Sequence, residues 1–288
     1  MTRKTVFATD TNVLLQRSRF SYKELKRPDG YPSGAVYGTI RSIDNYLKRF
    51  KPDIYVPVFD VGKSKLRKGI DGAYKANREE KDPTVFSQFT AVRGLLELMG
   101  MRPYFEDGVE ADDLVAKLVV DYTPEYGVMF CTQDHDLRQL VRPHAVMFKP
   151  QLQSRPDSFI KYDELKEELG IEPSQLADVW AIMGDSGDNI TGLRGWGFKK
   201  SLEAIRTYGS LEAAIGNDPR LTPHAATLLV NKTMISLDGK VAIKKPDMRP
   251  FSEVRESMYG NEEVMDFFEQ WGMKTLQAQY ADGELFGW

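Results

Sequence analysis

Three short apolar runs in this sequence each end in an aspartate, at Asp10, Asp60 and Asp134. The runs TVFATD, IYVPVFD and GVMFCTQD have the length and the β-type residues of buried strands. Helical patterns lie between them, which predicts βα units and a mostly parallel sheet flanked by helices. Because parallel strands end at one edge, the three carboxylates are expected to converge there. The alternative is that each aspartate only starts a turn, which Gly, Asn or Ser would do equally well.

Helices are expected between these strands. Over 33–50 the apolar residues recur at helical spacing and Ser33 is a candidate N-cap, whereas the chain between Asp10 and Ser33 is expected to be a loop. Helices are also predicted from Pro83 to a stop at Gly100 and over 110–122. The remaining predictions before Pro150 are a strand over 101–107, a short helix over 135–141 and a strand over 145–149.

The character of the chain changes after Pro150. From Tyr162 onward the sequence predicts helices only, and near the end Val264, Phe267, Phe268 and Trp271 share one helical face. That last helix is expected to pack back on the body. A length of 288 residues fits one compact body with an appendage.

Composition narrows the class of protein. The 41% apolar and 28% charged residues are ordinary for a soluble globular chain. We expect a cytoplasmic protein without signal peptide or membrane anchor, because the sequence has no run of 18 apolar residues and Cys131 is its single cysteine. The net charge of −3 argues against a nucleic-acid partner, but seven cations and three anions lie between Lys63 and Lys81. The charge distribution therefore favours such a partner.

Acidic residues also form three clusters in the sequence. Glu110, Asp112 and Asp113 fall in one first helical turn, where Glu110 and Asp113 share a face and capping is the alternative explanation. Pairs of aspartates follow in TQDHD and GDSGD. With the strand ends these places supply nine candidate metal ligands: Asp10, Asp60, Glu110, Asp112, Asp113, Asp134, Asp136, Asp185 and Asp188.

Oxygen ligands without a His or Cys cluster point to a hard cation, Mg²⁺ or Mn²⁺, rather than zinc. Two such ions roughly 4 Å apart clamp the attacking and leaving oxygens of a phosphoryl displacement, and nine acids suit two ions better than one. The expected substrate is therefore a phosphoester.

With these residues in place, the chain resembles the phage and bacterial 5′ nucleases, which include flap endonucleases and the 5′-3′ exonuclease domain of bacterial DNA polymerase I. The matching motifs run in family order over Val6 to Lys245: TDTNVLLQR, VFDVGKSKLR, YKANR, GVEADD, TQDHDLRQLV and MGDSGDNITGLRGWGFKK. The resemblance implies that the nine acids are the metal ligands. It also implies a PIN-like (Rossmann-like) α/β fold with a helical arch insertion and a helix-hairpin-helix subdomain.

In that family the basic segment forms an arch over the 5′ single strand, here about residues 62–84. The resemblance makes Lys75 and Arg78 catalytic cations beside Asp10 and Asp60, and it makes Tyr74 a ring for base stacking. It adds two further basic DNA-binding positions, Arg17 and Arg67.

The hairpin is expected to hold duplex DNA through its phosphates, with small residues for close backbone approach and cations beside them. Its implied DNA-binding residues are Gly192, Arg194, Gly195, Gly197, Lys199 and Lys200. A potassium ion at this hairpin is among the ligands that the resemblance implies.

The sequence departs from the family pattern at four positions without losing a ligand: Thr11, His135, Thr191 and Arg194. Of these, His135 changes a local charge, since lysine is common there, and Arg194 adds a candidate phosphate contact. His144 and His224 are expected to serve structure or to face solvent rather than to take part in catalysis.

The expected domains are a nuclease domain over 1–172, a helix-hairpin-helix subdomain over 173–240 and a C-terminal segment over 241–288. The expected activity is Mg²⁺-dependent hydrolysis near the 5′ ends of flap, nicked or branched DNA, by a monomer in a bacterial or phage-infected cell during replication and repair. An RNA primer as substrate and the polymerase partner are left open. The alternatives are a PIN-like RNase, which is typically shorter and lacks the arch and hairpin, and a non-catalytic branched-DNA binder, which would lack ligands.

Overall fold

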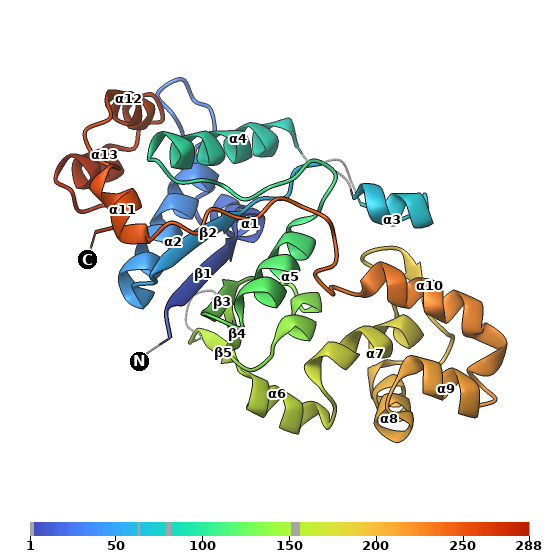
Figure 1. The fold of residues 1–288 in the computed structure, drawn as a ribbon. Helices are drawn as coiled ribbons and strands as arrows, with labels where there is room; N and C mark the ends of the chain where they lie inside the picture. The colour runs from blue at the N-terminus through green and yellow to red at the C-terminus, as the bar shows by residue number, and fades with distance from the viewer. Residues whose placement is uncertain (1–2, 63, 79–81, 151–155, 288) are drawn as a thin grey trace.

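The computed structural model describes residues 3–62, 64–78, 82–150 and 156–287. A five-stranded sheet in the order β2-β1-β3-β4-β5 forms its centre (Figure 1). Its members are the parallel strands β1 (Thr5–Asp10), β2 (Ile54–Val58), β3 (Gly127–Cys131) and β4 (Ala145–Lys149), and the antiparallel edge strand β5 (Ser158–Ile160). The predicted α/β architecture with a mostly parallel sheet is confirmed.

Two apolar cores cover the two faces of the sheet, since successive strand side chains point to opposite sides. Val6 and Ala8 belong to one core, together with α5 (Ala111–Tyr122). Phe7 belongs to the other, whose helices are α1 (Thr11–Ser21), α2 (Gly34–Phe50) and α4 (Pro83–Leu98). Burial on both faces explains why the parallel strands are continuous apolar runs in the sequence.

The second half of the chain is helical, as predicted, and contributes a small β-hairpin. Its elements are α6 (Tyr162–Leu169), α7 (Leu176–Met183), β6 (Gly184–Asp185), β7 (Ile190–Thr191), α8 (Phe198–Tyr208), α9 (Leu211–Asn217) and α10 (Ala225–Ile235). Short 3₁₀ helices occur at Asp136–Leu140, Pro173–Gln175 and Thr222–His224.

Three helices follow at the C-terminal end: α11 (Phe251–Glu256), α12 (Glu262–Gln270) and α13 (Lys274–Ala281). Val264 and Phe268 of α12 are buried in the core that α2 and α4 share. The predicted return of this segment to the body is therefore confirmed, and in Figure 1 the three helices lie beside α2 and α4.

The loop expected after Asp10 is wrong, because α1 occupies Thr11–Ser21. The Asp10 carboxylate caps this helix by accepting the Val13 N–H, and Leu14 and Leu15 bury its inner face. The other positions are largely polar, so the apolar stripe is too narrow to stand out in the sequence.

The third strand expected over 101–107 is also wrong. Only Tyr104 pairs with β2, as an isolated bridge to Val58, with its N–H donating to the Pro57 carbonyl at 2.8 Å. The Phe59 N–H donates back to the Tyr104 carbonyl at 2.9 Å, so the predicted strand is reduced to this single bridge.

The predicted basic segment is described only in part, because Lys63, Glu79, Glu80 and Lys81 lie outside the described residues. Within it, α3 (Lys65–Ile70) is helical and lies next to α10, to the side of the sheet (Figure 1). Among the described residues, no helix has the length and apolarity needed to cross a bilayer.

Candidate active site

The carboxylates of the three strand ends meet at one edge of the sheet, as predicted. Asp10 ends β1 and is buried, and its two oxygens accept hydrogen bonds at 3.2 Å from the Val13 N–H and the Thr132 hydroxyl. Asp60 follows β2, and its N–H donates to the Asn12 side chain at 3.1 Å. The neighbouring strand order β2-β1-β3 brings these positions together with the end of β3.

Four acids at this edge repel one another, and we call them the first carboxylate group: Asp10, Asp60, Asp112 and Asp134. Burial, together with the charges of Asp134 and Asp60, raises the pKa of Asp10 to about 7. Burial, Asp134 and Asp10 likewise raise the pKa of Asp112 well above its ordinary value. Four acids, of which Asp10 is buried and the other three are half-buried, thus lie close together, an arrangement that a bound cation would stabilise.

A second carboxylate group lies next to the first and consists of Asp136, Asp185 and Asp188, whose oxygens lie within 4.8 Å of one another. The β6-β7 hairpin supplies the last two. Burial, Asp134, Asp185 and Asp188 raise the pKa of Asp136 to about 7, although His135 lowers it. The sequence prediction that these distant motifs form one site agrees with this geometry.

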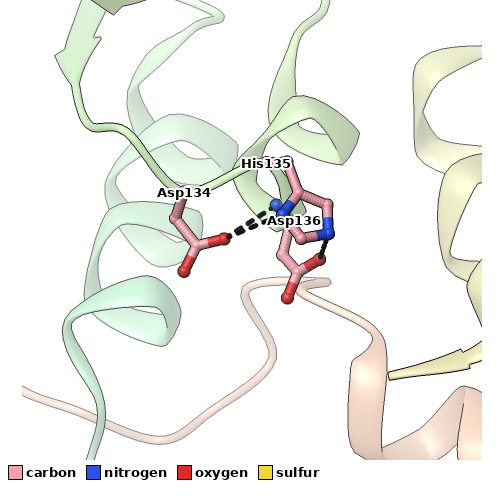
Figure 2. Close-up of side chains that lie close together, drawn as sticks. All are labelled: Asp134, His135 and Asp136. Carbon is pink, nitrogen blue, oxygen red and sulfur yellow. Dashed lines mark hydrogen bonds and ion pairs between the residues drawn. The ribbon is translucent and has the colours of Figure 1, made fainter. Parts of the chain in front are cut away.

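His135 lies between the two groups. Figure 2 shows Asp134, His135 and Asp136 side by side, with the His135 Nε2 atom 3.2 Å from an Asp136 oxygen. Its Nδ1 atom is 3.9 Å from an Asp134 oxygen. The imidazole therefore contacts both flanking carboxylates.

The two predicted catalytic cations reach the same site. The Lys75 Nζ atom lies 2.6 Å from Glu110 and 3.5 Å from Asp188, and an Arg78 nitrogen lies 2.6 Å from Asp188. Burial lowers the pKa of Lys75, but Glu110 and Asp188 raise it more, so its ammonium form is stabilised. The backbone also holds Lys75 at the site. Its φ of 54° is left-handed, and its N–H donates to the Asp188 carbonyl at 3.0 Å.

Amide side chains tie the arch segment to the hairpin. Asn77 donates to the Ser186 carbonyl at 2.7 Å, and Asn189 donates to the Ala73 carbonyl at 2.8 Å. Sequence reasoning missed both amides, together with Asn12 and Thr132. The sequence indicates these four residues only through their position inside the motifs that contain the acids and cations.

Arg67 is buried rather than open to DNA. Its guanidinium contacts both Asp113 oxygens, at 2.6 and 2.9 Å, and Glu110 at 2.9 Å, while its Nε donates to the Met234 carbonyl. Glu110 and Asp113 therefore stand apart from the two carboxylate groups as partners of Arg67 and Lys75. The other seven predicted ligands form those groups, and of these Asp188 also contacts Lys75 and Arg78.

The predicted stacking ring of Tyr74 is also buried, so neither ring face is open to a base in this structure. Its hydroxyl lies 3.0 Å from Glu110 and 2.8 Å from Asp188 and has one proton to donate between them. Arg17 is half-buried on α1, beside the Tyr46 hydroxyl.

The three glycines of the predicted helix-hairpin-helix element, Gly192, Gly195 and Gly197, differ in what surrounds them. A Cβ on Gly192 would come within 1.9 Å of the Met183 carbonyl oxygen, so this glycine allows β7 to pack on the end of α7. Gly195 needs its positive φ of 78°, and Gly197 faces open space. The hairpin cations Arg194, Lys199 and Lys200 are exposed, and the Lys200 ammonium lies 4.1 Å from the Trp196 ring centroid.

The chain matches two family models along most of its length. Residues 5–170 match the model described as 5′-3′ exonuclease, N-terminal resolvase-like domain, and residues 171–255 match the model described as 5′-3′ exonuclease, C-terminal SAM fold. The chain is 29% identical over 291 residues to a 5′-3′ exonuclease of Aquifex aeolicus, covering 95% of this chain and 99% of the relative.

Other relatives are longer. The thermostable DNA polymerase I of Thermus thermophilus is 34% identical over 222 residues, which are 76% of this chain and 26% of the polymerase. The matched part of the chain thus corresponds to about a quarter of that polymerase.

Solved structures share the fold at low identity. The T5 D15 protein co-crystallised with metal ions has a TM-score of 0.69 at 20% identity, covering 98% of this chain and 100% of that one. The catalytic core of Rad2 in complex with DNA substrate has a TM-score of 0.54 at 15% identity, with 92% of each chain covered. The predicted fold of the 5′ nucleases is confirmed, and the chain belongs to the 5′-3′ exonuclease family of nucleases.

Proposed function

We propose that this protein is an Mg²⁺-dependent 5′ nuclease that hydrolyses phosphodiester bonds near the 5′ end of flap, nicked or branched DNA. One observation carries the proposal: two carboxylate groups and two cations, drawn from motifs far apart in sequence, face one another at the carboxyl edge of the sheet. Negative charge alone would repel a phosphodiester, so divalent cations and the arch cations are needed to bring it there.

The donor set fits a hard divalent cation. Its ligand atoms are carboxylate oxygens, and the raised pKa values of Asp10 and Asp136 reflect burial and repulsion that a cation would relieve. Mg²⁺ would be held by the first group, Asp10, Asp60, Asp112 and Asp134, and by the second, Asp136, Asp185 and Asp188, with Mn²⁺ as a substitute. Bound there, the metal would supply activation of water and neutralisation of the leaving oxygen.

The chain's own cations take the phosphate. Lys75 and Arg78 are proposed to turn from Glu110 and Asp188 to the scissile phosphate and neutralise its developing charge. Glu110 and Asp113 would act mainly as partners of Lys75 and Arg67, which keeps the arch helix α3 against the site.

The hairpin is proposed to hold the duplex part of the substrate. The exposed cations Arg194, Lys199 and Lys200 suit phosphate contacts that position DNA without reading its sequence, and a potassium ion would sit at the same hairpin. The proposed division remains 1–172, 173–240 and 241–288. We propose a monomer acting in the cytoplasm of a bacterial or phage-infected cell, with tolerance for an RNA primer left to experiment.

The test is cleavage of end-labelled 5′-flap DNA with Mg²⁺ and then with EDTA, using the wild type, Asp134→Asn and the exposed control Asp163→Asn on α6. We expect Mg²⁺-dependent cleavage by the wild type and the control. Asp134→Asn should lose cleavage and still bind DNA in a gel-shift assay, because the hairpin and arch cations are untouched.

Flap DNA that survives the wild type in Mg²⁺ would refute the proposed activity. Turnover by Asp134→Asn close to that of the control would remove Asp134 from the metal site while leaving the nuclease assignment intact.

A further inference from the structure

His135 brings a nitrogen donor to a site whose other candidate ligands are oxygens. One of its ring nitrogens and one oxygen each of Asp134 and Asp136 lie within 4.8 Å of one another (Figure 2). The two aspartates belong to different carboxylate groups, Asp134 to the first and Asp136 to the second. Nothing in the proposed Mg²⁺ chemistry uses the imidazole.

The spacing of these atoms suits a coordination shell as well as a hydrogen bond. The His135 Nε2 atom lies 3.2 Å from an Asp136 oxygen. Zn²⁺ binds imidazole nitrogens and carboxylate oxygens at about 2.0 to 2.2 Å, so two ligands of a tetrahedral ion are about 3.4 Å apart. The pair can therefore accept such an ion with little movement of either side chain.

The imidazole is both held in place and accessible. Its ring meets the ring of the buried Trp180, on α7, at a centroid distance of 5.6 Å and an interplanar angle of 85°. Its side chain is 60% exposed, and it lines a cavity of about 570 Å³ together with Asp136 and Asp185. An ion can thus enter from solvent, and water molecules have room to complete its coordination shell.

We infer that His135, Asp136 and Asp134 form a site for Zn²⁺, an ion that accepts imidazole nitrogen where Mg²⁺ prefers oxygen. The consequence of this inference rests on the proposed function, because an ion held there engages one carboxylate of each group that is proposed to bind Mg²⁺. Zn²⁺ should therefore compete with Mg²⁺ and inhibit cleavage. In this role His135 determines which metal ion the site prefers.

Two substitutions separate a metal ligand from a hydrogen-bond or ion-pair partner of Asp136. His135→Phe keeps a ring beside Trp180 and removes both ring nitrogens. His135→Lys keeps a cationic donor for Asp136 but has no lone pair to offer an ion. His144→Asn is the matched control, because His144 is an exposed histidine on another turn and asparagine tolerates its φ of 67°.

Binding of Zn²⁺ and of Mg²⁺ to the full chain without DNA is measured by isothermal titration calorimetry. The wild type and His144→Asn should have the same Kd for Zn²⁺. Both His135 variants should raise the Kd for Zn²⁺, relative to that for Mg²⁺, at least about tenfold, since losing even an outer partner of a ligand costs about 10- to 100-fold. A ratio that keeps its wild-type value in either His135 variant would overturn the site.

A second measurement detects the ligand atom directly. The chain has three histidines, so the ring-nitrogen NMR resonances of His135 and His144 can be assigned with the variants above. Saturating Zn²⁺ should shift the His135 ring nitrogens and leave those of His144 in place. An unshifted His135 ring would overturn the site.

Cleavage of 5′-flap DNA in excess Mg²⁺ tests the consequence. Zn²⁺ should inhibit the wild type at a concentration at least about tenfold lower than it inhibits His135→Phe, and equal sensitivity would overturn the competition. Zn²⁺ binding needs no cleavage. A wild type that binds Zn²⁺ through His135 but leaves flap DNA intact in Mg²⁺ would therefore refute the proposed function alone, whereas cleavage without His135-dependent Zn²⁺ binding would refute this inference alone.

Discussion

Replacing Asp10 by asparagine should stabilise the metal-free protein while removing its activity. The carboxylate is buried, and its pKa rises from 3.8 to about 7 because burial, Asp134 and Asp60 disfavour the ionised form. At about 1.4 kcal/mol per pH unit, keeping it ionised at pH 8 costs the folded state about 4 kcal/mol. An asparagine keeps an oxygen for the Val13 N–H, and its amide can donate to the Thr132 hydroxyl.

The sign of the pH dependence follows from this shift. The folded-state pKa lies above the unfolded one, so for an acid the destabilisation is complete above pH 7 and disappears as the pH falls towards 3.8. The gain from Asp10→Asn should therefore fall from about 4 kcal/mol at pH 8 to about 2 kcal/mol at pH 5.5. At this chain length each kcal/mol raises Tm by about 2 °C, so about 8 °C is expected at pH 8.

The change in Tm is measured by thermal unfolding in EDTA, followed by circular dichroism. The exposed control Asp163→Asn should stay within about 0.5 kcal/mol of the wild-type free energy of unfolding. Added Mg²⁺ should stabilise the wild type more than Asp10→Asn, which lacks one carboxylate of the first group. An Asp10→Asn protein that melts below the wild type at pH 8, or a gain that is equal at both pH values, would refute the reasoning.

Two further substitutions test the supports of the site. Gly192→Ala places a Cβ within 1.9 Å of the Met183 carbonyl oxygen and should lower the urea midpoint of unfolding. The control Gly197→Ala adds a Cβ that faces open space and should leave the midpoint nearly unchanged. Equal midpoints for the two variants would contradict the packing role of Gly192. Arg67→Ala leaves the buried Glu110 and Asp113 without a guanidinium and should cost about 3 to 5 kcal/mol in urea unfolding. A stable variant with a reduced salt dependence of DNA binding would instead make Arg67 a phosphate contact.

The convergence of the acids could be predicted because it depends on topology alone. Apolar runs that end in Asp10, Asp60 and Asp134 imply parallel strands, and parallel strands end at one edge. No knowledge of side-chain contacts was needed for that step.

The burial of Arg67 and Tyr74 could not be predicted in the same way. Their partners, Met234 and Asp188, lie more than 100 positions further along the chain than Arg67 and Tyr74 do. A local sequence pattern does not predict contacts over such separations. An exposed arch cation and a buried one have the same sequence signature, a basic residue in a basic segment.

The sequence predicted the start of helix α2 but not the group that caps it. Ser33 stands directly before α2, as predicted, but its side chain makes no capping hydrogen bond. The Ala35 N–H instead donates to Gln88 of α4, 53 positions away. The position of a helix start is encoded locally, whereas the group that satisfies its first N–H can come from tertiary structure.

The distribution of the site along the chain also bears on synthesis. The four parallel strands are complete once Lys149 has been made, but the second carboxylate group needs Asp188, and the anchor of Arg67 needs Met234. At ordinary translation rates the interval from Lys149 to Met234 lasts on the order of ten seconds. A growing chain can thus bury its sheet well before its carboxylates and cations are assembled, so the capacity to cut DNA arrives with the last third of the polypeptide.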